Sequence, residues 1–191
     1  MEEWQEFFIK TVDIPSYSPS RLPNGKSETK KEFIENFCHN GNGATLTKLS
    51  MKYQPKVIAE MGTGWGIRTA LLARLNPNSV VHTIEISSEM GGNEPGLFAK
   101  SLKNVVFVRG NSNDWVLKDV ELCFIDADHS EQSVLLDSRR AFANRKEDNW
   151  CIVWDDYPLP EVCKSVDLFV KEVGYTLKGV GHGYVHIGSR E

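Results

Sequence analysis

The 191-residue chain lacks several features that would place it in a specialised class of protein. No apolar run approaches the roughly 20 residues that a membrane-spanning helix requires, so we expect no membrane partner. Basic residues are not in excess, because 22 lysines and arginines face 26 aspartates and glutamates, and the net charge of −4 disfavours a nucleic-acid binder. The acidic N-terminus has no basic segment followed by an apolar one, so we expect no signal peptide and a cytoplasmic location.

The cysteines do not suggest a metal-binding or disulfide framework. None of the four belongs to a CxxC pair, and two of them, Cys123 and Cys151, lie inside apolar runs that are typical of strands. Buried thiols of this kind behave as small apolar residues. The pattern therefore predicts reduced, structural cysteines.

The composition changes near residue 55, which divides one compact domain into two parts. Residues 1–54 are predicted to form an N-terminal cap of loops and three helices, each marked by an apolar stripe. Residues 13–27, between the first two helices, hold three prolines and one glycine in a polar stretch and therefore form a loop. This loop is either disordered or a mobile flap over a site.

Residues 55–191 form the predicted core, in which strands and helices alternate. The predicted strands are 57–61, 80–86, 105–108, 122–125, 150–154, 175–180 and 184–187. Residues 87–103 are expected to form a helix broken by glycines, or a helix plus a loop. Because the strands read as continuous apolar runs separated by helices, the pattern predicts an α/β fold with a mainly parallel sheet that is covered on both faces.

The most informative segment is the glycine-rich turn that follows the first core strand. The strand ends near Glu60, and Gly62, Gly64 and Gly66 follow before a helix begins. Glycines allow a ligand to touch the backbone, and the helix N-terminus offers free N–H groups. A dinucleotide fingerprint would need its third glycine at position 67, which is Ile67 here. Glu60 would repel a pyrophosphate but suits an ammonium, so the loop fits a zwitterionic amino-acid tail better than a dinucleotide.

Two further strand ends offer partners for a nucleoside. Glu85 ends the second strand, where a carboxylate can accept both hydroxyls of a ribose. Asn111 and Ser112 follow the third strand, where an adenine could continue from its ribose. The alternatives are a solvated acid at a strand end for Glu85 and a simple turn for the other two residues.

With these residues in place, the chain resembles the class I S-adenosylmethionine-dependent methyltransferases over residues 57–188. The string E-M-G-T-G-W-G and Glu85 carry the resemblance. It implies a Rossmann-like, doubly wound, mostly parallel sheet of seven strands in the order 3-2-1-4-5-7-6, with the last strand antiparallel. The cofactor-binding residues that it implies are Glu60, Gly62, Thr63, Gly64, Gly66, Glu85, Ile86, Asn111, Ser112 and Asp126.

A second group of acids ends the fourth and fifth strands. Asp126 follows the fourth strand, and Asp155 and Asp156 follow the fifth. Because the carboxyl ends of parallel strands meet at one edge, these carboxylates should gather near Glu60 and repel one another. A divalent cation such as magnesium, manganese or calcium would relieve the repulsion. The alternative for Asp156 is a helix-capping role.

The strings FIDADHS and VWDDY resemble the divalent-metal-dependent O-methyltransferases of the catechol, caffeoyl-coenzyme A and macrocin types. This resemblance implies metal ligands at Asp126, Asp155 and Asp156. It also implies that His129, beside Asp126 in the catalytic set, takes the proton of the substrate hydroxyl. The alternative for His129 is a histidine at a helix start that donates to a carboxylate.

The predicted function is methyl transfer from S-adenosylmethionine to a hydroxyl of a small molecule, either phenolic or a sugar, aided by a divalent metal. Trp65, Trp154 and Tyr157 should border the pocket, where they either stack on the substrate or pack in the core. The expected partner is the small-molecule substrate, and a homodimer is possible. The rival functions are an NAD-dependent or nucleotide-binding oxidoreductase and a non-catalytic module that binds S-adenosylmethionine.

Overall fold

The computed structural model describes residues 42–89, 94–181 and 183–190. The first two predicted cap helices and the loop at 13–27 lie outside these ranges, so the division into a cap and a core stays a prediction. The third cap helix is confirmed as α3 (Asn42–Tyr53), which ends two residues before Pro55. A proline at this position cannot continue a helix, which explains where α3 stops.

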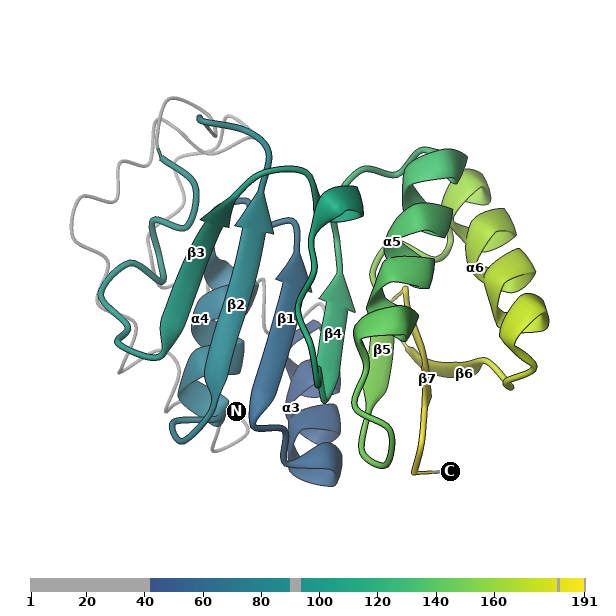
Figure 1. Ribbon diagram of the computed structural model, residues 1–191, viewed down its shortest axis with the longest axis horizontal. Helices are drawn as coiled ribbons and strands as arrows, with labels where there is room; N and C mark the ends of the chain where they lie inside the picture. The colour runs from purple at the N-terminus through teal and green to yellow at the C-terminus, as the bar shows by residue number, and fades with distance from the viewer. Residues whose placement is uncertain (1–41, 90–93, 182, 191) are drawn as a thin grey trace.

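Seven strands in the described residues form one sheet in the order β3-β2-β1-β4-β5-β7-β6 (Figure 1). The strands are β1 (Val57–Met61), β2 (Val80–Glu85), β3 (Val105–Arg109), β4 (Leu122–Ile125), β5 (Cys151–Trp154), β6 (Lys178–Gly181) and β7 (Tyr184–Gly188). Strands β1 to β5 pair in parallel, and β7 is antiparallel to both of its neighbours. The predicted strand order and the antiparallel last strand are both confirmed.

Helices cover both faces of this sheet (Figure 1). Helix α3 packs with α4 (Ile67–Leu75) on one face, and α5 (Glu131–Asn144) packs with α6 (Pro160–Val173) on the other. Local sequence fixes the bounds of α6, which begins with a proline and ends at a left-handed Gly174. In the described part of the chain, no helix is long and apolar enough to cross a membrane.

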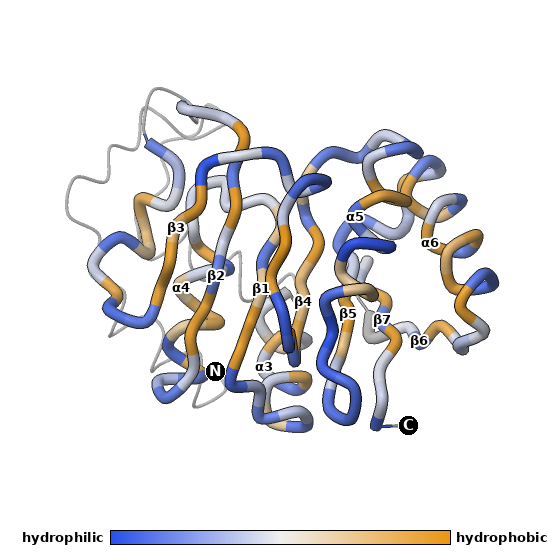
Figure 2. Tube along the Cα trace, in the orientation of Figure 1, coloured by the Kyte–Doolittle hydropathy of each residue, from blue (hydrophilic) through white to orange (hydrophobic). Residues whose placement is uncertain are grey.

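Each central strand contributes side chains to two separate apolar cores. Along β4, Leu122 and Phe124 pack with α3 and α4, whereas Cys123 and Ile125 pack with α5 and α6. Figure 2 shows hydrophobic central strands joined by largely hydrophilic loops. Burial on both faces explains why the central strands read as continuous apolar runs. Cys123 and Cys151, which lie in β4 and β5, are buried free thiols as predicted.

In the described residues between β2 and β3, the structure departs from the prediction of a helix. Residues 95–101 form consecutive turns instead. The reason lies in the bonding of this segment to the glycine loop: the Gly96 amide donates to the Gly64 carbonyl over 2.9 Å, and the Phe98 amide donates to the Trp65 carbonyl over 3.1 Å. These amides are therefore not available for a helical ladder. Through these two hydrogen bonds, the segment holds the backbone of the glycine loop.

Candidate functional site

The glycine loop lies at the carboxyl edge of the sheet and contacts the loop that follows β4. Gly62, Gly64 and Gly66 all have positive φ, which favours glycine. A Cβ on Gly62 would lie 1.9 Å from the backbone oxygen of Asp126, so any side chain there would collide with the chain after β4. The loop predicted to bind the cofactor and the first acid of the predicted metal site are thus in direct backbone contact.

Glu60 lies inside the protein, directly before this loop. Its side chain accepts hydrogen bonds from the hydroxyls of Thr69 and Thr83, the latter over 2.7 Å, and the residue is only 1% exposed. Burial, with a smaller contribution from the charge of Asp126, raises the pKa of Glu60 to about 7 against the opposing hydroxyl bonds. A buried carboxyl held by neutral donors is therefore partly protonated near neutral pH.

Glu85 lies beside the glycine loop. One carboxylate oxygen accepts from the Gly64 amide over 3.0 Å, and the other accepts from the Ser87 amide over 2.9 Å. The following residue, Ile86, is 66% exposed and offers an apolar surface next to the carboxylate. The second strand end therefore presents an acid that is fixed by backbone amides beside an open apolar side chain.

The predicted adenine-side residues belong to a short 3-10 helix, η2 (Ser112–Asp114), that is tied to α5. Asn111 caps η2 through a bond from the Asn113 amide. The Asn113 side chain donates to the fully buried Asp137 over 2.7 Å, and Arg140 donates to the Asn113 carbonyl. The loop after β3 is therefore held by the helix that begins after His129.

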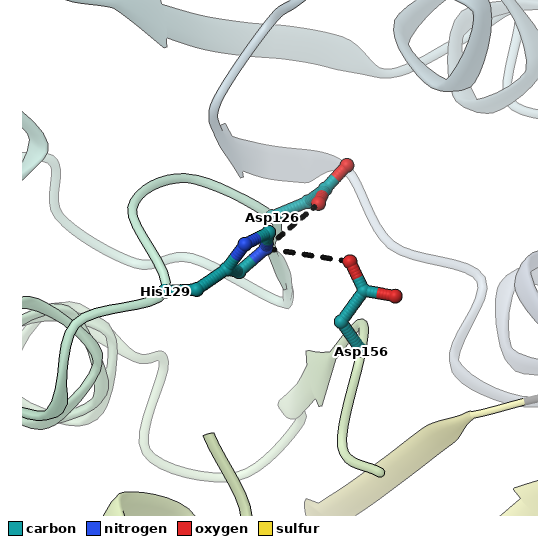
Figure 3. A group of neighbouring side chains, drawn as sticks. All are labelled: Asp126, His129 and Asp156. Atoms are coloured by element: carbon teal, nitrogen blue, oxygen red, sulfur yellow. Dashed lines mark ion pairs between the residues drawn. The ribbon is translucent and has the colours of Figure 1, made fainter. Parts of the chain in front are cut away.

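Three of the predicted residues converge after β4 and β5 (Figure 3). The His129 Nε2 atom lies 3.3 Å from Asp156 Oδ2 and 3.9 Å from Asp126 Oδ1. Asp126 is the main cause that raises the pKa of His129, against partial burial, and Asp156 adds to the effect. The His129 and Asp156 side chains are each nearly half exposed, so this cluster is open to a substrate.

An arginine that the sequence analysis did not single out lies next to this cluster. Arg68, in the first turn of α4, donates from Nη1 to Asp126 Oδ2 over 2.7 Å and from Nη2 to Asp155 Oδ2 over 2.6 Å. Its Nε donates to the Tyr184 hydroxyl over 3.2 Å, and the guanidinium lies 5.7 Å from the centre of the Phe124 ring. Burial alone would lower the pKa of Arg68, but the adjacent acids and the tyrosine raise it above its ordinary value.

Among the described residues, the group that could hold a metal ion contains two of the three predicted ligands but not Asp155. Asp126, His129 and Asp156 each offer one ligand atom, and these atoms lie within 4.8 Å of one another. Two carboxylates and an imidazole are donors that divalent cations accept, so this set fits a metal. Asp155 faces Arg68 and is only 6% exposed, and burial raises its pKa to about 6 although Arg68 opposes the shift.

The aromatic residues predicted at the pocket take different positions. Trp154 is buried and donates from its indole nitrogen to Ser138, so it packs in the core. Trp65 packs edge-on against Phe98, and the Tyr157 hydroxyl donates to Asp167. Both of the latter are partly buried.

No protein-family model matches the sequence, and no curated protein matches it. Solved structures do resemble the fold. The SAH-bound methyltransferase PaMTH1 from Podospora anserina has a TM-score of 0.64 at 14% identity, over 97% of this chain and 87% of that chain. An O-methyltransferase from Bacillus cereus in complex with SAH has a TM-score of 0.60 at 17% identity, over 98% and 90%. A candidate caffeoyl-CoA O-methyltransferase from Staphylococcus aureus has a TM-score of 0.58 at 16% identity, over 84% and 92%.

These identities are low, and the likeness is one of fold. The predicted resemblance to class I methyltransferases therefore holds at the level of architecture: the chain has their seven-stranded Rossmann-like fold.

Proposed function

We propose that the protein transfers a methyl group from S-adenosylmethionine to a hydroxyl of a small phenolic or sugar substrate. The observation that carries this proposal is the contact between Gly62 and the backbone of Asp126. It joins a loop suited to a zwitterionic cofactor to a cluster suited to hydroxyl activation. The SAH bound in two structures of the same fold supports the choice of cofactor.

The cofactor would lie along the carboxyl ends of β1, β2 and β3. The backbone from Gly62 to Gly66, beside Glu60, would hold the methionine moiety. Glu85 would accept the ribose hydroxyls, with Ile86 against the nucleoside. Asn111 and Ser112 would flank the adenine. In this arrangement the methyl group would lie near the end of β4, where Asp126 follows the strand.

Methyl transfer needs a deprotonated oxygen that is aligned with the carbon–sulfur bond. The substrate oxygen attacks the methyl carbon, the carbon–sulfur bond breaks, and the sulfonium becomes the neutral thioether of S-adenosylhomocysteine. The hydroxyl proton passes to Nε2 of His129, which is a base near neutral pH. Asp126 and Asp156 stabilise the resulting imidazolium because both carboxylates lie within 4 Å of that nitrogen.

A divalent cation fits the same cluster. Asp126 and Asp156 would hold it, and the resemblance to metal-dependent enzymes implies Asp155 as a third ligand, although Asp155 contacts Arg68 in this structure. When bound, the cation lowers the pKa of a coordinated hydroxyl.

The test is methyl transfer to a panel of catechols, phenolic esters and glycosides, with labelled S-adenosylmethionine, in the presence and absence of EDTA. We expect transfer to at least one acceptor, loss of nearly all turnover in EDTA, and recovery with added magnesium or manganese. Equilibrium dialysis against S-adenosylmethionine and NAD accompanies the assay. Binding of NAD alone would favour an oxidoreductase, and binding of S-adenosylmethionine without transfer to any acceptor would favour a non-catalytic module.

A further inference from the structure

The charged side chains at the carboxyl edge form a line of contacts in which acids and bases alternate. Asp126 divides its two oxygens between Arg68, which contacts Oδ2, and His129, which lies nearest Oδ1. The consecutive acids after β5 divide in the same way: Asp155 contacts Arg68, and Asp156 lies beside His129. The order of charges along the line is therefore acid, arginine, acid, histidine, acid.

The two basic groups reach this line from opposite faces of the sheet. Arg68 belongs to α4, and its guanidinium lies against Phe124, which is part of the core beneath α3 and α4. His129 comes from the loop before α5, which covers the other face. Asp126 lies between them, so Arg68 contacts one oxygen of this carboxylate and the other oxygen faces His129.

Arg68 satisfies the Asp155 side of the line. Its planar fork donates to two different carboxylates at 2.6 and 2.7 Å, and its charge is present at every pH near neutrality. The remaining oxygen of Asp155 accepts from the Asp156 amide over 2.8 Å. Both oxygens of Asp155 are thus engaged within the protein, and a cation between Asp126 and Asp155 would have to displace the guanidinium.

We propose that Arg68 is the resident counter-ion of Asp126 and Asp155, that Asp155 is a positioning residue for Arg68, and that a divalent cation is confined to the Asp126–His129–Asp156 side. This inference adds detail to the proposed function, and it rests on that proposal for the role of the site in methyl transfer. It departs from the ligand set that the resemblance implies, because Asp155 leaves that set.

The charge balance gives the inference a measurable consequence. Three carboxylates and one guanidinium leave two negative charges at this edge when His129 is neutral. Removing the guanidinium leaves three negative charges and frees two oxygens. Coulomb attraction at these short distances then increases strongly, so the affinity for a divalent cation should rise.

The experiment measures Mn²⁺ binding by electron paramagnetic resonance, with the full chain and no cofactor or substrate. We expect Arg68→Met to bind Mn²⁺ at least about tenfold more tightly than the unchanged protein. Asp155→Asn should stay within about threefold of the unchanged protein, whereas Asp156→Asn should bind at least about tenfold more weakly. Arg68→Lys keeps the charge but not the fork, so it should bind Mn²⁺ less tightly than Arg68→Met does. Glu161→Gln, an exposed acid in the first turn of α6, is the matched charge control.

The inference is overturned if Asp155→Asn weakens Mn²⁺ binding as much as Asp156→Asn does, or if Arg68→Met binds no more tightly than the unchanged protein. Mn²⁺ binding that is detectable only in Arg68→Met supports it, and an absence of binding in every variant overturns it. If Arg68→Met does not fold, Asp155→Asn and Asp156→Asn decide the question. Calorimetry with S-adenosylmethionine on the same proteins separates the two proposals, because failure of the unchanged protein to bind the cofactor contradicts the proposed function and leaves the Mn²⁺ comparison intact.

Discussion

The two halves of the carboxyl edge hold their acids by different means. On the β1–β2 side, Glu60 accepts from threonine hydroxyls and Glu85 accepts from backbone amides. On the β4–β5 side, the acids face the charged group of Arg68 and the titratable His129. A neutral donor positions a carboxylate but does not offset its negative charge. A charged partner offsets that charge, and the resulting pair is sensitive to bound ions and to pH.

This difference matches the tasks that we propose for the two halves. A cofactor cradle built on amides and hydroxyls keeps its shape whatever the salt concentration, because these donors carry no net charge. A cluster that moves a proton must instead change its charge during each turnover. Substitutions on each side can therefore show whether the two halves act separately.

The largest expected effect is on the β4–β5 side. Replacing His129 with asparagine should lower the rate of methyl transfer in a single turnover by roughly 10²- to 10⁴-fold, because the proton acceptor is lost. The affinity for S-adenosylmethionine should change by no more than a few fold, since the cofactor is proposed to lie on β1 to β3. His82→Asn, on β2, is the matched control and should keep the rate. Equal losses of rate and cofactor affinity in His129→Asn would mean that the halves do not act separately.

The β1–β2 side offers the next effect. Glu85→Ala should weaken binding of S-adenosylmethionine at least about tenfold, because hydrogen bonds to a charged group are worth about 1.5–3 kcal/mol each. The fold should persist, and Mn²⁺ binding at the other half should not change. Calorimetry gives the first quantity and paramagnetic resonance the second.

Glu89→Ala controls for the loss of one negative charge, because Glu89 is exposed and lies only four residues further on. A cofactor affinity in Glu85→Ala that equals that of Glu89→Ala would remove Glu85 from the proposed ribose contact.

Within the described residues, the sequence predicted the sheet correctly because its central strands are buried on both faces. The apolar runs of β1, β4 and β5 read clearly, and the strand order followed from the resemblance that Glu85 and the glycine loop support. The prediction of a helix was wrong for residues 95–101, where the Gly96 and Phe98 amides bond to Gly64 and Trp65, which lie far away along the chain. Such long-range competition leaves no local pattern to detect.

The site was predicted less completely for a similar reason. The acids at the strand ends stand out by position, and the structure brings Asp126 and Asp156 together with His129, whereas Asp155 contacts Arg68. The role of Arg68 depends on a side chain that spans from α4 to β4 and β5, and spacing does not predict such a reach. One local signal was present: a positive residue in the first turn of a helix is unfavourable for the helix dipole, so its presence suggests a partner elsewhere.

The smallest expected effect concerns the buried acid on the cofactor side. The pKa of Glu60 is about 7 in the folded protein and 4.5 in its ordinary state, so the folded protein binds more protons between these values. The free energy of unfolding must therefore fall as the pH rises through this window, and Glu60 alone should lower it by about 1 kcal/mol between pH 6 and pH 8. Glu60→Gln does not titrate, so its stability relative to the unchanged protein should rise by that amount over the same interval.

Urea unfolding at the two pH values measures this difference without cofactor or metal. Other titrating groups, including Asp155, contribute to both proteins and cancel in the comparison. The exposed Glu161→Gln should run parallel to the unchanged protein at both pH values. If the stability of Glu60→Gln also ran parallel to that of the unchanged protein, the hydroxyls of Thr69 and Thr83 would offset the Glu60 charge as well as an arginine does. The two halves of the edge would then not differ at Glu60, the most buried acid of the cofactor side.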